Sequence, residues 1–196
     1  MKYNCLSSPS YHLSNYSIIT VRKKDLKLIK KWRNEQMDVL RQKIVLTDAD
    51  QEKYFCKVIQ PSTKEDKPNN IIFSFIKKRR CIGYGGLTNI DWDSKKAELS
   101  FLVNTSHYQD TKIYRKDFSV FLQIILNLSF VELSFNRIFT ETYDNRPTHV
   151  DILEKHGFKL EGRLKQHVFK RGIFLDSFVH GLLRQHYINN NKSQIQ

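Results

Sequence analysis

The sequence predicts an α+β fold in which a mixed, mostly antiparallel sheet is flanked by helices. Residues 97–103 alternate in polarity and are rich in strand formers, and residues 137–143 form a second run of that kind. Between them, apolar side chains recur at helical spacing: Phe118, Phe121, Ile124, Ile125, Leu128 and Val131. Because a helical crossover of this length returns the chain right-handed to the same sheet, the two strands should be parallel neighbours.

The next predicted helix has marked ends. Pro147 suits a first helical turn, and Gly157 suits the left-handed position just past the last one. Residues 148–156 therefore form a short helix after the second strand of the parallel pair.

Shorter local patterns predict the elements before residue 97. Residues 18–22 form a first strand, and Asp25 precedes a helix with one apolar face. The Thr47-Asp48 pair, with Gln51 three residues after the aspartate, indicates the cap of a second helix. Residues 60–70 contain two prolines and no apolar side chain, so they are expected to form a flexible surface loop.

Two hairpins complete the predicted sheet. Residues 71–76 and 81–90 flank a basic turn and form an antiparallel pair, and a second turn leads to the strand at 97–103. Residues 159–170 and 173–183 form a final hairpin. The sheet then has about six to seven strands around the central parallel pair.

Length and composition fit a single domain, placed at residues 18–183 of the 196-residue chain. Residues 1–17 lack a period and are expected to be an irregular arm, and residues 184–196 a disordered polar tail. The chain opens without a signal-like segment and has no apolar run near the ~20 residues of a membrane span, so we expect a cytoplasmic protein without membrane contact. The three cysteines are scattered and lack metal-ligand spacing.

Several motifs carry a resemblance to a known family. The hexapeptide Leu153-Glu-Lys-His-Gly-Phe158 follows a strand and an Asn-containing turn, and it resembles the closing signature of GNAT-superfamily N-acetyltransferases. Four further motifs occur in the order seen in the ribosomal-protein and amino-sugar acetyltransferase branch: Trp32-Arg33-Asn34, Ile82-Gly-Tyr-Gly-Gly-Leu87, Ala97-Glu98 and Tyr108-Gln109. The resemblance implies a GNAT-like sheet with its parallel strands splayed apart, and acetyl-CoA as cosubstrate without a metal.

The resemblance also implies where the coenzyme binds. Main-chain groups of Phe101, Leu102 and Val103 would bind the pantetheine arm much as an added strand would, and Asn145 is a further candidate contact. One N–H of this strand can face the thioester oxygen as negative charge develops on it.

The phosphate-binding segment departs from the family pattern. The pyrophosphate is expected at the start of the long helix, after Tyr108 and Gln109, where the family has a glycine-containing loop. This chain has no glycine there. Lys112, Arg115 and Lys116 are expected to bind the phosphates by side-chain charge instead, the alternative being a loop that has lost tight coenzyme binding.

Acetyl transfer to an amine needs an unprotonated nucleophile, so a base is required. By resemblance Glu98 is the expected base, and Glu141 on the neighbouring strand is the competing carboxylate and a candidate acceptor contact. The family often protonates the departing thiolate with a tyrosine, but the matching residue here is Leu153. Tyr143 or His149 is therefore the candidate acid, unless no dedicated acid exists.

The acceptor pocket is expected between the loop after the first helix and the final hairpin. Candidate contacts are Arg41, Gln42, Tyr84, His167 and Phe169. The acceptor is a small-molecule or protein amine: an amino-sugar on a nucleotide, or the N-terminal amine of a basic protein. A homodimer is a further expectation.

The net charge of +13 predicts an anionic partner or surroundings, but it does not choose among them. Coenzyme A, a nucleotide-sugar, ribosomal RNA and an acidic protein would each satisfy it. Two alternatives to the enzyme therefore stay open. One is a non-catalytic binding module with a degenerate coenzyme loop. The other is a nucleic-acid-binding protein, which no stacking-aromatic or helix-turn-helix motif supports.

Overall fold

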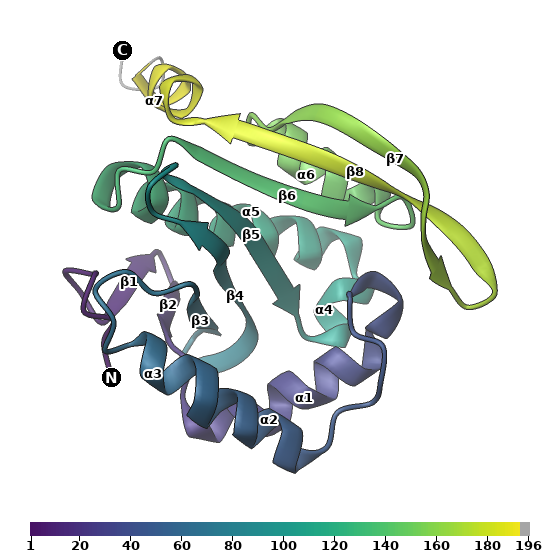
Figure 1. Ribbon diagram of the computed structural model, residues 1–196, viewed down its shortest axis with the longest axis horizontal. Coiled ribbons are helices and arrows are strands. Elements are labelled where there is room, and N and C mark those ends of the chain that lie inside the picture. Colours follow the sequence, from purple (N-terminus) through teal and green to yellow (C-terminus); the bar gives the residue numbers. More distant parts are fainter. Residues whose placement is uncertain (193–196) are drawn as a thin grey trace.

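The computed structural model describes residues 1–192, which form one sheet with helices on both faces (Figure 1). The strands are β1 (Ser10–Leu13), β2 (Tyr16–Thr20), β3 (Ile71–Lys77), β4 (Arg80–Asp91), β5 (Lys96–Val103), β6 (Arg137–Tyr143), β7 (Lys159–Lys170) and β8 (Ile173–Leu183). The helices are α1 (Leu26–Glu35), α2 (Asp48–Tyr54), α3 (Gln60–Ser62), α4 (Thr105–Gln109), α5 (Thr111–Asn127), α6 (Pro147–Lys155) and α7 (Arg184–Lys192). None of these helices is long and apolar enough to cross a membrane.

The sheet order within the described residues is β1-β2-β3-β4-β5-β6-β8-β7. Every neighbouring pair is antiparallel except β5 and β6, which are parallel. The predicted mixed fold, both hairpins and the central parallel pair are thus confirmed. Within the described residues the sheet has eight strands rather than the expected six to seven, and the additional strand is β1.

The expectation of an irregular arm at residues 1–17 is wrong for most of that segment. It contains β1 and the start of β2, and the side chains of Tyr3 and Leu6 lie in the core. The Tyr3 hydroxyl accepts a hydrogen bond from the backbone N–H of Ile72 at 2.8 Å and lies 3.2 Å from its carbonyl oxygen. The segment therefore belongs to the folded domain.

Three further boundaries differ from prediction. Thr47 does cap α2, but its capping-box partner is Asp50 rather than Gln51. A π-helical turn, Phe55–Ile59, extends that helix into α3, so the expected loop at 60–70 begins only after Ser62. The expected disordered tail forms α7 as far as residue 192, and residues 193–196 lie outside the described part of the chain.

The Asp25 side chain does not cap α1 either. It accepts two hydrogen bonds from Arg22 and one from the buried Ser74 hydroxyl, which ties the start of the helix to β3. A competing ion pair has replaced the predicted local cap.

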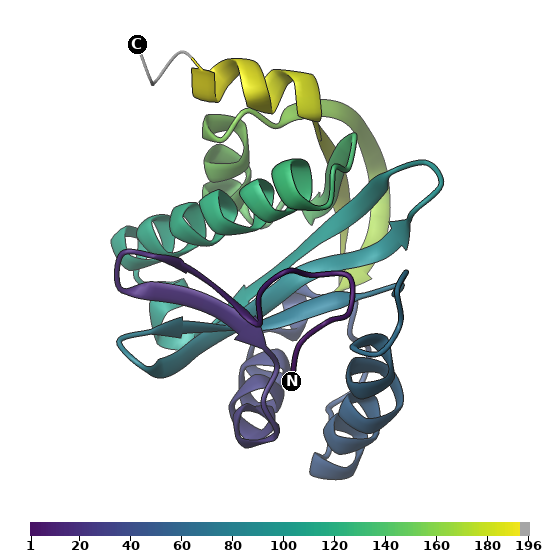
Figure 2. The ribbon, with the colours of Figure 1, turned by 90° about the vertical axis from the view of Figure 1, so that its left-hand side faces the viewer.

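Two apolar layers hold the helices against the sheet. On one face, α5 packs Phe118 and Phe121 against Phe101 of β5. On the other face, α1 and the π-helical turn pack against β3, β4 and β5, with Trp32 and Leu102 in the same cluster. Figure 2 shows green α5 above the strands, and purple α1 and blue α2 and α3 below them.

A buried carboxylate connects α5 to the first half of the sheet. Asp117 is fully buried and accepts hydrogen bonds from the Tyr16 hydroxyl at 2.7 Å and the Lys77 ammonium at 3.0 Å. Its second oxygen lies 2.5 Å from Nδ1 of His107. Three separate elements thus depend on one side chain.

Replacing Asp117 with asparagine should lower the free energy of unfolding by about 2–4 kcal/mol, because it leaves a partly buried ammonium without its counter-ion. Urea unfolding followed by circular dichroism measures the change. Asp93→Asn, at a carboxylate that is 98% exposed, is the matched control and should have almost no effect. Equal losses from the two substitutions would show that the Asp117 contacts do not stabilise the fold.

Candidate functional site

The parallel strands β5 and β6 pair only at their beginnings. Their ladder joins Lys96, Ala97 and Glu98 to residues 137–139 and then stops. Beyond it β5 remains paired with β4, and β6 with β8, so the two halves of the sheet separate. Figure 1 shows the two ribbons diverging toward their arrowheads, with α5 behind them. The backbone edge of residues 99–103 therefore has no strand partner on this side.

A cavity of about 420 Å³ lies at this separation and is called here the β5–β6 cavity. Its lining comes from α1, the loop after it, both parts of the split sheet and the start of α6. The lining residues are Arg33, Val39, Leu40, Arg41, Gln42, Tyr84, Thr88, Asn89, Glu98, Ser100, Phe101, Thr140, Glu141, Tyr143, Arg146 and His149. The cavity thus collects most of the residues that the sequence predicts for catalysis and acceptor binding.

Glu98 is a buried carboxylate on the lining of this cavity. Its side chain is 8% exposed and lies on the same strand face as Ser100, as the two-residue period of a strand requires. The Arg41 guanidinium donates to both of its oxygens, at 2.6 and 3.1 Å, and the Asn89 amide donates at 2.7 Å. Glu98 is therefore held by an ion pair and a neutral donor.

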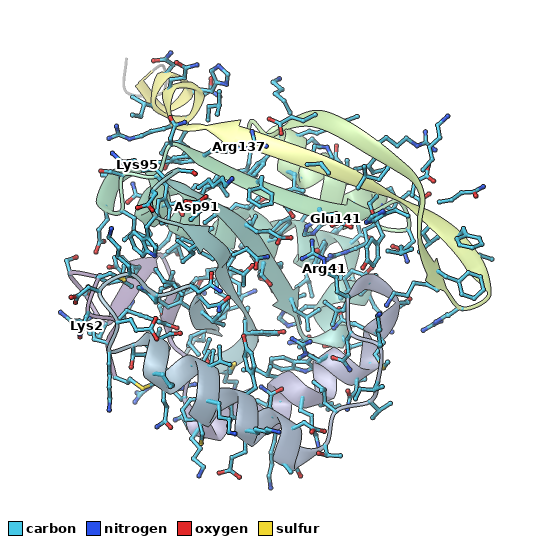
Figure 3. The ribbon with its side chains drawn as sticks, viewed as in Figure 1. Lys2, Arg41, Asp91, Lys95, Arg137 and Glu141 are labelled. Atoms are coloured by element: carbon cyan, nitrogen blue, oxygen red, sulfur yellow. The ribbon has the colours of Figure 1, made fainter. Side chains whose placement is uncertain are left out.

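Arg41 also binds the second carboxylate. It donates to Glu141 at 2.8 Å, and Figure 3 shows these two side chains close together in the split between the sheet halves. The hydrogen bonds that Arg41 donates to Glu98 raise the pKa of its guanidinium above the ordinary value. Burial alone would raise the pKa of Glu141, but the Arg41 guanidinium, through its hydrogen bond and its charge, helps to hold it below its ordinary value. Both carboxylates therefore share one cation.

The loop that carries Arg41 is held by side-chain contacts. The Lys170 ammonium donates to the carbonyl oxygens of Met37, Leu40 and Gln42 at 3.0, 2.6 and 3.2 Å. At the other end of the loop, the Asn34 side chain pairs with the backbone N–H and C=O of Leu46.

Two of the predicted acceptor contacts are tied to Arg33. Its guanidinium donates to the Gln42 side chain at 3.0 Å and to the Tyr84 hydroxyl at 2.6 Å. Both residues are buried and line the β5–β6 cavity.

The other two predicted acceptor contacts differ in position. His167 lies at the edge of the site, with Nε2 3.7 Å from a Glu141 oxygen. Phe169 lies at the tip of the β7–β8 hairpin, 62% exposed and packed on Phe174, outside the cavity lining.

The two candidate acids have different environments. Burial raises the pKa of Tyr143, and its hydroxyl forms no hydrogen bond among the described residues. Burial, with the charges of Arg146 and His180, lowers the pKa of His149 well below its ordinary value. Nδ1 of His149 also lies 2.6 Å from the Tyr114 hydroxyl. A neutral imidazole whose Nδ1 is already hydrogen-bonded is a poor proton donor at neutral pH, whereas the Tyr143 hydroxyl stays protonated.

The expected basic phosphate loop is helical. Tyr108 and Gln109 lie in α4, and Lys112, Arg115 and Lys116 lie in the first turns of α5. Asp110 caps α5, accepting from the N–H groups of Lys112 and Ile113 at 2.9 and 3.0 Å. Lys112 and Lys116 are exposed, and Arg115 pairs with Asp151. The Asp110 side chain therefore binds the backbone N–H groups at the start of α5, where the sequence analysis expected the pyrophosphate.

The other residues expected to bind the coenzyme lie on the separated part of β5 and in the turn before α6. Phe101, Leu102 and Val103 lie in the part of β5 beyond the β6 ladder, and the Val103 carbonyl accepts from the Gln36 amide at 2.9 Å. Asn145 is exposed in the turn before α6, and its amide donates to the Asp38 carbonyl at 3.3 Å.

The sequence interpretation missed several lining or adjoining residues, among them Asn89, Tyr114 and Arg146. Tyr114 lies one helical turn before Phe118, so extending the apolar period by four residues would have found it. Arg146 had no comparable signal. Within the described residues no group of three His, Cys, Asp or Glu side chains could hold a metal ion.

Comparison with known proteins connects this geometry to a family. The family model described as an acetyltransferase (GNAT) domain matches residues 18–179. The chain is 24% identical over 176 residues to a Bacillus licheniformis protein named uncharacterized N-acetyltransferase p20, covering 86% of this chain and 94% of that protein.

Solved structures show the same fold. The spermidine N-acetyltransferase of Vibrio cholerae, solved with CoA and spermine, superposes with a TM-score of 0.77 at 21% identity, covering 90% of this chain and 100% of that one. A dodecameric structure of the Vibrio enzyme gives a TM-score of 0.75 at 20% identity, covering 91% and 99%.

Replacing Arg41 with methionine should raise the pKa of Glu141 toward its ordinary value, because the guanidinium hydrogen-bonds to the ionised carboxylate and stabilises it. Carbon-detected NMR titration of the glutamate side chains measures this change. Arg171→Met is the control, since Arg171 pairs with Asp38 and lies outside the cavity lining. A Glu141 midpoint that does not move would contradict the shared-cation arrangement.

Proposed function

The chain belongs to the GNAT acetyltransferase family, and on that premise we propose that it acetylates a primary amine bound in the β5–β6 cavity. Family membership makes it an N-acetyltransferase with acetyl-CoA as cosubstrate. One observation carries the proposed location: the family match includes both separating strands, and two carboxylates meet in the cavity where the ladder ends. Acetyl-CoA supplies the acetyl group as an activated thioester.

The residues present suit both halves of the reaction. The edge of β5 at residues 99–103 has no strand partner on the β6 side and offers main-chain groups for an extended ligand, although the Val103 carbonyl already accepts from Gln36. We propose that Glu98, with Glu141 as the competing carboxylate, takes the proton of the acceptor ammonium, directly or through water, and that Tyr143 gives one to the leaving sulfur. An amine that enters the cavity would compete with Arg41 for these two carboxylates.

The charge of the cavity favours an acceptor that carries an anionic group beside its amine. Three guanidinium groups line the cavity, those of Arg33, Arg41 and Arg146. Only two carboxylates oppose them, and Arg41 already pairs with both. A linear polyamine would meet these cations with no unshared carboxylate to bind it. We therefore favour the amino-sugar of a nucleotide over a polyamine.

The remaining alternatives concern the acceptor and whether the chain is an enzyme. The N-terminal amine of a protein stays an alternative acceptor. The family match does not favour a non-catalytic module or a nucleic-acid-binding protein. A cytoplasmic location and a homodimer stay expectations for this chain.

Incubation with acetyl-CoA and an amine panel tests the proposal. The panel contains UDP-glucosamine, spermidine and a peptide with a free N-terminus, with release of free thiol and product mass as readouts. We expect acetylation of the nucleotide amino-sugar. Acetylation of spermidine alone would overturn the acceptor assignment, and absence of any acetylated amine would overturn transfer in this cavity.

Glu98→Gln should lower turnover by about 100-fold or more, because it removes the base while keeping the size of the side chain. The loss should shrink as pH rises and the amine deprotonates without help. Steady-state rates across a pH series measure this, with Glu141→Gln as the paired variant. Full turnover in Glu98→Gln beside a crippled Glu141→Gln protein would assign the base to β6.

A further inference from the structure

Arg146 is a buried cation without an anionic partner in the described chain. It lies just before α6, is 8% exposed and lines the β5–β6 cavity. Its Nη2 donates to the Tyr114 hydroxyl at 3.0 Å and to Nδ1 of His149 at 3.2 Å, and its guanidinium lies 5.9 Å from the centre of the Tyr108 ring. Among residues 1–192, no carboxylate oxygen lies within ion-pair distance of it.

The Nε–H group of Arg146 is also buried and has no hydrogen-bond partner among the described residues. An unsatisfied buried donor costs about 1–3 kcal/mol, and more when it is charged. The other deeply buried charges of the fold have partners: Asp25 pairs with Arg22, and Asp117 with Lys77. Arg146 thus differs from the charges that hold the structure together.

The neighbours of Arg146 do not cancel its charge. Burial raises the pKa of Tyr114 to about 12, so its hydroxyl stays protonated and neutral at pH 7. Burial, with the Arg146 charge, lowers the pKa of His149, so the imidazole is neutral too. Both described side chains that accept hydrogen bonds from this guanidinium are therefore neutral.

The start of α5 cannot supply this charge as readily. The backbone N–H groups of Lys112 and Ile113 in its first turn already donate to the Asp110 carboxylate. The negative charge of that carboxylate would also repel an incoming anion. The cations of the first turns are exposed or, for Arg115, paired with Asp151.

We propose that Arg146 is the anion-binding group of the β5–β6 cavity and that it binds a phosphate oxygen of a bound ligand. This rests on the proposed function, because it takes the cavity to be the acetyl-transfer site. A guanidinium with a free Nε–H suits a phosphate oxygen through a charge-assisted hydrogen bond. Two ligands of the reaction could bring this group: coenzyme A through its pyrophosphate, or the acceptor through a nucleotide phosphate.

Calorimetric titration of the full chain separates the two sources. The probes are coenzyme A, pantetheine, which lacks the phosphates, and UDP-glucosamine. Arg146→Gln should weaken binding of the phosphate-bearing ligand by about 10- to 100-fold, the range for losing a charge-assisted hydrogen bond. Pantetheine binding should be unchanged, and the salt dependence of the weakened ligand should decrease.

Each outcome decides the inference. A loss confined to coenzyme A assigns the phosphate to the coenzyme, and a loss confined to UDP-glucosamine assigns it to the acceptor. The control is Arg137→Gln, since Arg137 pairs with Glu161 and lies outside the cavity lining. A loss no larger than that of the control, or an equal loss for pantetheine, would overturn the proposal.

A second measurement covers the case in which Arg146→Gln does not fold. The Nε–H resonance of Arg146 is assigned in the unmodified chain by its disappearance in Arg146→Lys. It should shift on addition of the phosphate-bearing ligand and not on addition of pantetheine, and an unmoved resonance would overturn the proposal. Both readouts report binding without turnover. A chain that binds through Arg146 but acetylates no amine would therefore overturn only the proposed function.

Discussion

The early end of the β5–β6 ladder is the constraint on which the site depends. Parallel strands normally continue their hydrogen bonds along the shared length, but here pairing stops after Glu98. Two halves of one sheet then diverge while α5 still covers one face of β5. This produces an edge of β5 without a strand partner and a cavity beside it, without any loop having to open. The divergence of the two strands therefore forms the sheet side of the cavity, and the loop after α1 supplies Arg41 and Gln42 to it.

Charge placement separates structural from functional groups around this opening. Asp117 and Asp25 are buried and surrounded by donors, which is what a stable fold requires of buried carboxylates. Glu98 and Glu141 share Arg41, whose side chain is 56% exposed and able to exchange with solvent or ligand. Arg146 has neutral neighbours only. Arg146, which lines the cavity, is therefore the buried charge that the protein itself satisfies least.

Local signals account for the parts of the fold that sequence could predict. The hairpin of β3 and β4, the parallel pair and α6 each had a period or a capping residue within a few positions. The β1–β2 hairpin did not, because its apolar contacts are made by Tyr3, Leu6 and Tyr16 among polar residues, and their burial depends on distant strands. The helical start of α5 was missed because the absence of glycine was interpreted as a changed loop rather than as a capped helix.

The same division applies to the site. The sequence could name Glu98, Glu141 and Arg41 because motif order placed them on known strands and loops. It could not show that one guanidinium joins both carboxylates, since that contact spans 57 and 100 residues of chain. Arg146 could not be predicted because it lies in a turn before Pro147 and belongs to no periodic pattern. Only its burial without a carboxylate partner distinguishes it.

The side-chain anchoring of the loop after α1 has an evolutionary consequence. Lys170 and Asn34 fix its two ends by binding backbone groups, so their hold does not depend on the identity of the side chains between them. Ile44 and Val45, inside the loop, are well exposed and contribute little to the core. Substitutions at these two positions should change the free energy of unfolding little, while Arg41 in the same loop lines the β5–β6 cavity. The stretch around Ile44 and Val45 can therefore accumulate substitutions over generations, while the anchored ends keep Arg41 in place and the sheet and its split stay unchanged.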